Sequence, residues 1–249
     1  RGIARDLSAV GLGRLKKLEI KKIKGSFISD INWKRDFRKN HEHLCPGVSG
    51  RLFKNITNLE SPEWLKKRLL AIGLRPISSL VDITNYITVD LGRPLHVYDA
   101  DKIRGNLCMR LAKKGEKCKT LDEKEYSLDE EMIVISDDRK IHGIGGIMGG
   151  FDSGCSFETK NVFLEVALFD PISVTKTGRN INLQSDARFR FERGIDYTSI
   201  DWGVDKATEM ILNLCGGEVS EVSKVISDKL KEQKVKVIKY DFNITKSLG

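Results

Sequence analysis

The segment from Asn161 to Phe169 is almost continuously apolar, and one carboxylate, Glu165, interrupts it. An apolar run of this length is typical of a buried strand, and it is the strongest constraint that the sequence places on the fold. The chain has 249 residues, of which 40% are hydrophobic and 31% charged. That is enough for one large domain or two modest ones with a substantial core.

A helix is predicted to begin near Ser61, with Ser61 as its N-cap, Pro62 at the first helical position and Gly73 as its C-terminal cap. Its apolar face is expected to consist of Trp64, Leu65, Leu69 and Ile72. Further helices are expected within 1–12, 171–179 and 197–214, and strands at 51–59, 86–89, 103–111, 132–136 and 235–240. Alternating Arg and Phe over 186–194 suit a strand with one apolar face.

The positive charge is confined to one end of the chain. The first 40 residues hold twelve basic and four acidic side chains, and the remaining 209 balance at 31 of each, so the net charge of +8 lies in the first 40 residues, nearly all of it within Arg14 to Lys39. Such a segment can attract phosphates, although a basic linker would have the same composition. The neutral remainder must recognise any nucleic acid by a pocket rather than by bulk charge.

The chain shows no sign of membrane insertion, secretion, a disulfide framework or a zinc site. No apolar run approaches the roughly 18 residues of a spanning helix, and Arg1 to Ala9 lack a signal-peptide core. The five cysteines are scattered, which fits reduced thiols in the cytosol. His41, His43 and Cys45 would share one face of an extended strand, but their spacing matches no common zinc site, so we expect a loop there.

Two side chains could carry chemistry. A carboxylate within a buried strand is costly unless it is paired, so Glu165 is either half of a structural ion pair or a pocket-lining group that recognises a ligand or transfers protons. His96 follows Gly92 and Pro94 in what reads as a loop, where it could be aimed at a substrate or simply hydrogen-bonded.

The glycine-rich segment from Gly143 to Gly150 resembles a phosphate-binding loop but fails the pattern at Met148, and no Gly-Lys-Ser/Thr follows. Its glycines allow the backbone to approach either a packed strand or a ligand. No Gly-x-Ser-x-Gly elbow and no local Cys–His pair is present, so a covalent nucleophile is not evident. The Asp and Arg cluster between Asp186 and Gly194 is more typical of bracing than of catalysis.

Seven short motifs then occur in a fixed order: SPEWL (61–65), GLRPI (73–77), VDITNY (81–86), GRPLHVYD (92–99), GGIMGG (145–150), FERGID (191–196) and CGG (215–217). Together they resemble the B3/B4 region of the bacterial phenylalanyl-tRNA synthetase beta subunit. The resemblance implies an α+β fold with mixed or antiparallel sheets and packed helices. It divides the chain into the tail of a B1-like domain (1–12), a basic connector (13–44), the B3/B4-like domain (45–217), and a connector with the start of a B5-like domain (218–249).

In that family the B3/B4 region edits: it hydrolyses the ester of tyrosine wrongly attached to tRNA(Phe). A pocket that accepts phenylalanine cannot strongly reject an analogue that merely adds a hydroxyl, so a second site must read that hydroxyl. The resemblance implies that this fragment hydrolyses the ester without a cofactor of its own. Aminoacylation, with ATP and Mg²⁺, would belong to the full enzyme, an α2β2 heterotetramer in the cytoplasm that binds tRNA(Phe).

The resemblance also assigns roles residue by residue. His96 and Asn85 match the groups at the scissile ester, where they would orient water, the ribose or the amino acid. Glu165 matches the carboxylate that reads the tyrosine hydroxyl. The remaining matches are Arg75 for the terminal adenosine or its phosphate, Gly149 for substrate space, Ala187 for the pocket wall, and Ser185, which stands where some relatives carry threonine.

Two other interpretations remain open at this stage. The chain could be a structural or tRNA-binding module of the synthetase with a degenerate pocket, although keeping His96, Glu165, Asn85, Arg75 and Ala187 together argues against decay. A free-standing hydrolase is less favoured, because the first methionine is Met109 and the flanking domains look truncated.

Overall fold

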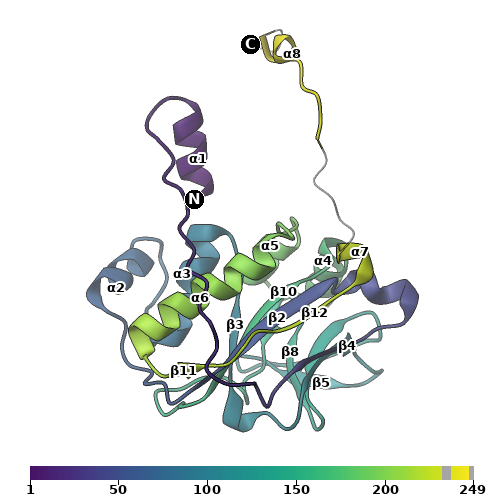
Figure 1. Ribbon diagram of the computed structural model, residues 1–249. Coiled ribbons are helices and arrows are strands. Elements are labelled where there is room, and N and C mark those ends of the chain that lie inside the picture. The colour runs from purple at the N-terminus through teal and green to yellow at the C-terminus, as the bar shows by residue number, and fades with distance from the viewer. Residues whose placement is uncertain (232–236, 247–249) are drawn as a thin grey trace.

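The buried strand lies in the middle of a layered α+β fold (Figure 1). The computed structural model describes residues 1–231 and 237–246. Strand β10 (Val162–Leu168) pairs antiparallel with β2 (Gly47–Lys54) on one side and β3 (His96–Asp99) on the other. The short strands β11 (Glu218–Val219) and β12 (Ser223–Ile226) complete this first sheet along β2.

The second sheet is ordered β1-β4-β7-β8-β9, and all its pairs except β1–β4 are antiparallel. Its strands are β1 (Trp33–Asp36), β4 (Leu107–Leu111), β7 (Ile133–Ser136), β8 (Ile141–Ile144) and β9 (Met148–Gly149). A separate hairpin joins β5 (Lys117–Lys119) to β6 (Glu125–Ser127). The predicted α+β class with mixed and antiparallel sheets is confirmed.

The helices are α1 (Gly2–Ala9), α2 (Glu63–Leu70), α3 (Ser79–Leu91), α4 (Pro171–Asn180), α5 (Asp186–Phe191), α6 (Ser199–Cys215), α7 (Asp228–Lys231) and α8 (Phe242–Lys246), with the 3₁₀ turns η1 (Lys39–Leu44) and η2 (Ala100–Lys102). Helices α2, α3 and α6 cover the outer face of the first sheet, whereas α1 and α8 project away from both sheets (Figure 1). Among the residues that the structure describes, no helix is both long and apolar enough to cross a membrane.

Two hydrophobic cores meet on β10, which explains why its sequence is apolar throughout. Leu164 and Val166 contribute to a core beneath α2, α3 and α6. Phe163 and Ala167 point the other way, into a core shared with the second sheet. A strand covered on both faces loses the alternation of polar and apolar residues. Glu165 shares the face of Phe163 and Ala167, so it points between the two sheets.

Most of the predicted elements are present, but some expectations are wrong. Tyr86 to Val89 belong to helix α3 rather than to a strand, and α3 ends at Gly92 in the left-handed conformation (φ +68°). His96 therefore begins strand β3 instead of lying in a loop. Residues 186–191 form helix α5, because the Ser185 hydroxyl accepts a hydrogen bond from the N–H of Arg188 and caps it.

Helix α2 also differs in detail from the prediction. Pro62, not Ser61, is its N-cap, because the Ser61 hydroxyl donates to buried Asp82 at 2.6 Å instead of capping. Leu65 and Leu69 are fully buried, as predicted. Trp64 and Ile72 are 42% and 51% exposed, so the apolar face is a narrow stripe of residues four positions apart.

The segments expected to be connectors contribute to the same sheets. Within the expected connector 13–44, residues 33–36 form β1, which pairs with β4, and in the expected connector after 217 strand β12 lies along β2. Val235 and Lys236 of the expected strand 235–240 lie outside the described residues, and 237–240 have no regular structure. At the end of the expected connector and B5-like start (218–249), helix α8 covers 242–246, and residues 247–249 lie outside the described part.

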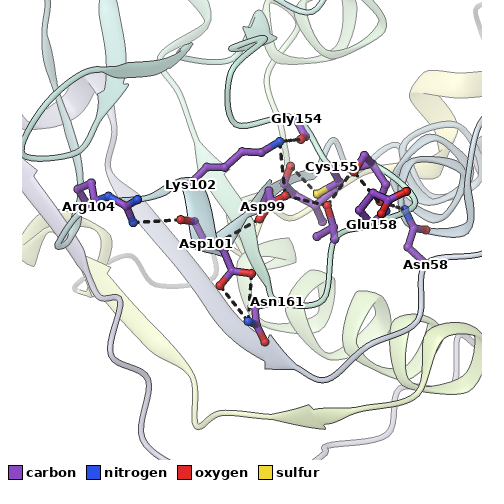
Figure 2. A network of polar contacts seen from close by, with 12 residues as sticks. Asn58, Asp99, Asp101, Lys102, Arg104, Gly154, Cys155, Glu158 and Asn161 are labelled. Carbon is purple, nitrogen blue, oxygen red and sulfur yellow. Dashed lines mark hydrogen bonds and ion pairs between the residues drawn. The ribbon is translucent and has the colours of Figure 1, made fainter.

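A polar network fixes the far end of β3 to the chain that enters β10 (Figure 2). Buried Asp99 accepts a hydrogen bond from the Thr159 hydroxyl at 2.8 Å and lies 3.4 Å from the ammonium group of Lys102. Lys102 also donates to the carbonyl of Gly154, and the Asn161 amide donates to exposed Asp101 at 2.9 Å. The network therefore holds the β3–β10 register on which the position of His96 relative to Glu165 depends.

We expect Asp99→Ala to lower the free energy of unfolding by about 2–3 kcal/mol, because it leaves the buried Thr159 hydroxyl without an acceptor. Asp101→Ala removes an exposed carboxylate from the same network and should cost less than about 1 kcal/mol. Urea unfolding of the two variants measures both values. Equal losses would contradict a register-holding role for Asp99.

Candidate functional site

A pocket of about 340 Å³ opens between the two sheets, next to α3 and α5. Six of the seven expected site residues line it: Asn85, His96, Gly149, Glu165, Ser185 and Ala187. They come from α3, β3, β9, β10, the cap of α5 and α5 itself. Most other lining residues are apolar, as is usual for a site that binds a small organic group.

Glu165 is the buried carboxylate of this pocket, with 7% of its surface exposed. Its Oε2 accepts a hydrogen bond from the Tyr98 hydroxyl. Among the described residues, Tyr98 makes the one hydrogen bond to this carboxylate and no cation forms an ion pair with it, so the ion-pair interpretation does not hold. Burial raises the pKa of Glu165 to about 7, although the hydrogen bond from Tyr98 and the charge of Arg93 act to lower it.

Arg93 supports the pocket from behind. Its buried guanidinium donates to the carbonyls of Ala167 at 2.7 Å and Pro94 at 2.9 Å, so it ties the start of β3 to β10. Burial lowers the pKa of Arg93 to about 9, and the group still carries its charge at neutral pH. The charge of Arg93 favours the ionised form of Glu165 and so acts to lower the pKa of that carboxyl.

His96 lies directly opposite Glu165 in the β3–β10 ladder, on the same face of the sheet. Its Nε2 is enclosed and has no hydrogen-bond partner among the described residues. Burial, assisted by the charge of His142, lowers the pKa of His96 to about 4. The imidazole is therefore neutral at pH 7 and can orient a reacting group, but it is a weak base.

The glycine-rich segment serves packing at one end and the pocket at the other. A methyl group on Gly145 or Gly146 would collide with side chains of the core, including Phe169. A methyl group on Gly149 would instead overlap with Cε1 and Nε2 of His96. The backbone of Gly149 is in an ordinary conformation, so the missing side chain itself, rather than backbone freedom, gives His96 its place.

The remaining expected residues differ in their surroundings. Asn85 and Ala187 are half-buried in the pocket wall. Ser185 lines the pocket, but its hydroxyl already donates to the carbonyl of Ile147 at 2.6 Å and caps α5, so it anchors the wall. Arg75 is exposed on the connection between α2 and α3 and is not part of the pocket lining.

The pocket offers no activated nucleophile. Burial raises the pKa of Cys155, the lining cysteine, to about 12, so its thiol stays protonated. The Thr84 hydroxyl is engaged by the carbonyl of Val81 at 2.7 Å. All five cysteines are free, and the described residues contain no cluster of three His, Cys, Asp or Glu side chains that could hold a metal. His41 and His43 lie on the 3₁₀ turn η1, not on a strand.

Sequence reasoning missed Tyr98 and Arg93 as parts of the site. Both lie in the motif from Gly92 to Asp99, but Tyr98 is recognised as a neighbour of His96 only when that motif is treated as a strand with side chains alternating between faces. The bracing role expected for the Arg cluster does hold, because buried Arg188 donates to the carbonyls of Gly178 and Leu183.

Residues 44–216 match the family model described as the B3/4 domain. The chain belongs to this family. Its relatives include the phenylalanine–tRNA ligase beta subunit of Paramagnetospirillum magneticum, which is 51% identical over 221 residues, covering 89% of this chain and 28% of that protein. The beta subunit of Novosphingobium aromaticivorans is 46% identical over 248 residues, covering 100% of this chain and 30% of that protein.

The chain thus spans less than a third of the length of the relatives it matches. The resemblance to the B3/B4 region of the beta subunit is confirmed by these matches. A solved N-terminal fragment of the phenylalanyl-tRNA synthetase beta subunit from Pyrococcus horikoshii is also similar, at 19% identity and a TM-score of 0.41, over 71% of this chain and 55% of that one.

The overlap between residue 149 and the His96 ring can be tested by a double-mutant cycle. Gly149→Ala should lower the free energy of unfolding by about 1–3 kcal/mol, because the imidazole must move aside. In a His96→Ala background the same substitution should cost no more than about 0.5 kcal/mol, since the obstacle is gone. Chemical unfolding of the four proteins gives the coupling energy. Equal costs in both backgrounds would show that the strain lies elsewhere.

Proposed function

We propose that the chain is part of a phenylalanine–tRNA ligase beta subunit and that its pocket hydrolyses tyrosine esters of tRNA(Phe). The observation that carries the proposal is the half-satisfied carboxylate of Glu165 at the bottom of a mostly apolar pocket, opposite a neutral imidazole. The aromatic side chain of an aminoacyl ester would enter this pocket. Its hydroxyl would donate to Oε1 of Glu165.

The same carboxylate accounts for selectivity. A phenylalanine side chain would fill the pocket but leave Oε1 enclosed without a donor. An unsatisfied buried group of this kind costs about 1–3 kcal/mol, which corresponds to a preference for tyrosine of roughly 5-fold to 150-fold. Discrimination by a hydrogen bond supplies what an apolar pocket alone could not.

Hydrolysis would proceed without a covalent intermediate. A water oxygen attacks the ester carbonyl carbon, the bond to the ribose oxygen breaks, and a proton from water ends on the ribose hydroxyl. His96, neutral and unpartnered at Nε2, orients the water or the ribose, and the Asn85 amide lies in the same wall to hold the water or the amino acid. The engaged hydroxyls of Ser185 and Thr84 and the protonated thiol of Cys155 support this route.

The other components belong to the whole enzyme. The alpha subunit, in an α2β2 assembly in the cytoplasm, would carry out aminoacylation with ATP and Mg²⁺, and other regions would bind most of the tRNA. Exposed Arg75 lies outside the pocket, where it could contact the terminal adenosine or its phosphate beyond the ester. No cofactor is needed for hydrolysis by this region.

In the complete synthetase, wild type should release tyrosine from tyrosyl-tRNA(Phe) much faster than phenylalanine from the correct ester. Glu165→Ala should lower tyrosine release by about tenfold or more because the hydroxyl loses its acceptor, and His96→Ala should lower hydrolysis of the tyrosyl ester as well. Glu131→Gln, an exposed carboxylate outside this pocket, is the matched control. A wild-type rate equal to spontaneous hydrolysis would favour the alternative, a structural or tRNA-binding module.

The pH dependence follows from the burial of Glu165. Its pKa is raised to about 7, so the carboxylate form that best accepts the phenol appears only as pH rises through 7. We expect kcat/KM for the tyrosyl ester to rise across this range and the inflection to vanish in Glu165→Gln. His96, with its pKa lowered to about 4, should add no inflection near 6.5. A profile measured between pH 5.5 and 8.5, corrected for spontaneous ester hydrolysis, checks both statements.

A further inference from the structure

We infer that Tyr98 is a specificity-determining residue of this pocket, which orients the Glu165 carboxylate so that Oε1 is left for the hydroxyl of the substrate. The inference rests on the proposed function and deepens it. Tyr98 and the tyrosyl substrate carry the same chemical group, a phenol. In the proposed complex, both phenols would donate to the carboxylate of Glu165.

Tyr98 is held by a hydrogen bond at its hydroxyl and by two imidazole rings against its own ring. The residue is 1% exposed, and its hydroxyl donates to Oε2 of Glu165. The edge-on ring of His96 lies 4.5 Å away between ring centroids, at an interplanar angle of 79°. The ring of His142 lies 6.3 Å away at 76°. A phenol held in this way cannot swing out of the pocket without disturbing both imidazoles.

The surroundings behind Tyr98 are themselves fixed. His142 Nε2 lies 2.8 Å from a carboxylate oxygen of Asp137, and both side chains are fully buried. Asp137 also accepts hydrogen bonds from the backbone N–H groups of Arg139 and Lys140. His142 is thus a rigid support for the Tyr98 ring.

The β3–β10 register explains why Tyr98 reaches Glu165. His96 and Tyr98 are two residues apart on β3 and share one face of the sheet, on which Glu165 lies directly across from His96. Tyr98 is its diagonal neighbour, within reach for a long aromatic side chain. The carboxylate of Glu165 therefore shares one sheet face with the imidazole that would orient the reacting atoms and with the phenol that fixes its rotamer.

The elements packed against Glu165 supply few other groups that could replace Tyr98. Arg93 precedes β3 and acts through its charge, buried Cys45 lies before β2 with its thiol protonated, and His96 is neutral. Among the described residues, Tyr98 alone donates a hydrogen bond to the carboxylate. Without that hydroxyl, both oxygens lack a donor, and the carboxyl can rotate and bind a proton more readily.

Two phenols and two oxygens then define the selectivity. The Tyr98 hydroxyl donates to Oε2 of Glu165, and the hydroxyl of a tyrosyl ester would donate to Oε1, so both oxygens would have a donor. A phenylalanyl ester would leave Oε1 without one. With Tyr98 absent, an incoming tyrosyl ester meets a carboxyl whose free oxygens are not directed, so the difference between the two esters shrinks.

The test is Tyr98→Phe in the complete synthetase, because this change keeps the ring between His96 and His142 and removes only the hydroxyl. We expect kcat/KM for the tyrosyl ester to fall about tenfold, with the phenylalanyl ester unchanged and the pH inflection of the tyrosyl reaction moved upward. Tyr126→Phe is the matched control, since its hydroxyl also donates to a carboxylate, that of Asp122, outside the pocket. Unchanged selectivity, or faster tyrosine release because a competing phenol has gone, would overturn the inference.

A second measurement on the 249-residue chain does not depend on activity. Infrared difference spectra between wild type and Glu165→Gln isolate the Glu165 carboxyl band, and its titration is compared with the same pair in the Tyr98→Phe background. The midpoint should move to higher pH without the hydroxyl, and an unmoved midpoint would overturn the positioning role. A wild-type synthetase that hydrolyses neither ester would overturn the proposed function together with the specificity role. An active wild type with an unmoved midpoint would overturn this inference only.

Discussion

The burial of the Glu165 carboxylate is the constraint that the rest of the site has to satisfy. The strand that carries it lies between two hydrophobic cores, so solvent reaches only a small part of the carboxylate, through the pocket. The neighbouring strands compensate in different ways: Tyr98 donates to it, and Arg93 contributes charge from the start of β3. On the other side, Gly50 of β2 is its ladder partner, where a side chain would collide with the Leu164 carbonyl and the Trp33 indole.

The layered arrangement gives the two cores separate tasks. The core beneath α2, α3 and α6 is built mainly from aliphatic side chains and holds β10 from the outside. Buried Glu165 and His142 adjoin the core between the sheets, and the pocket opens at its edge. The ligand-facing walls come from segments far apart in sequence, α3, β3, the glycine-rich segment and α5, so only the complete fold assembles them.

The sequence predicted the elements with strong local signals and missed those that depend on pairing. The run from 161 to 169, helix 171–179 and helix 197–214 follow from periodicity and caps, and the structure contains them as β10, α4 and α6. Strand β3 has only four residues and no pattern of its own, because its neighbours in the sheet decide its conformation. Over only six residues, the Arg–Phe alternation in α5 is compatible with the two-residue period of a strand and with the 3.6-residue period of a helix. The hydrogen bond from the Arg188 N–H to the Ser185 hydroxyl caps the segment and favours the helix.

The same distinction holds at the site. Glu165 could be singled out from its apolar context alone, and the motifs that resemble the beta subunit added His96, Gly149, Asn85 and Ala187, which the structure places around one pocket. Tyr98 could not be singled out, because its role requires the register between β3 and β10. The position of Arg75 outside the pocket likewise depends on how α2 joins α3, which local sequence does not determine.

The network around Asp99 has a consequence for how the site could fail. Side chains alternate along a strand, so sliding β10 by one residue would exchange the faces of all its side chains. Glu165 would then enter the aliphatic core under the helices, and Leu164 would take its place beside His96. The pocket would then present an aliphatic side chain in place of the carboxylate that we propose accepts the phenol of the substrate. The ion pair and hydrogen bonds of Figure 2 hold this register, so the proposed substrate choice also depends on Asp99 and Thr159, which lie outside the pocket lining.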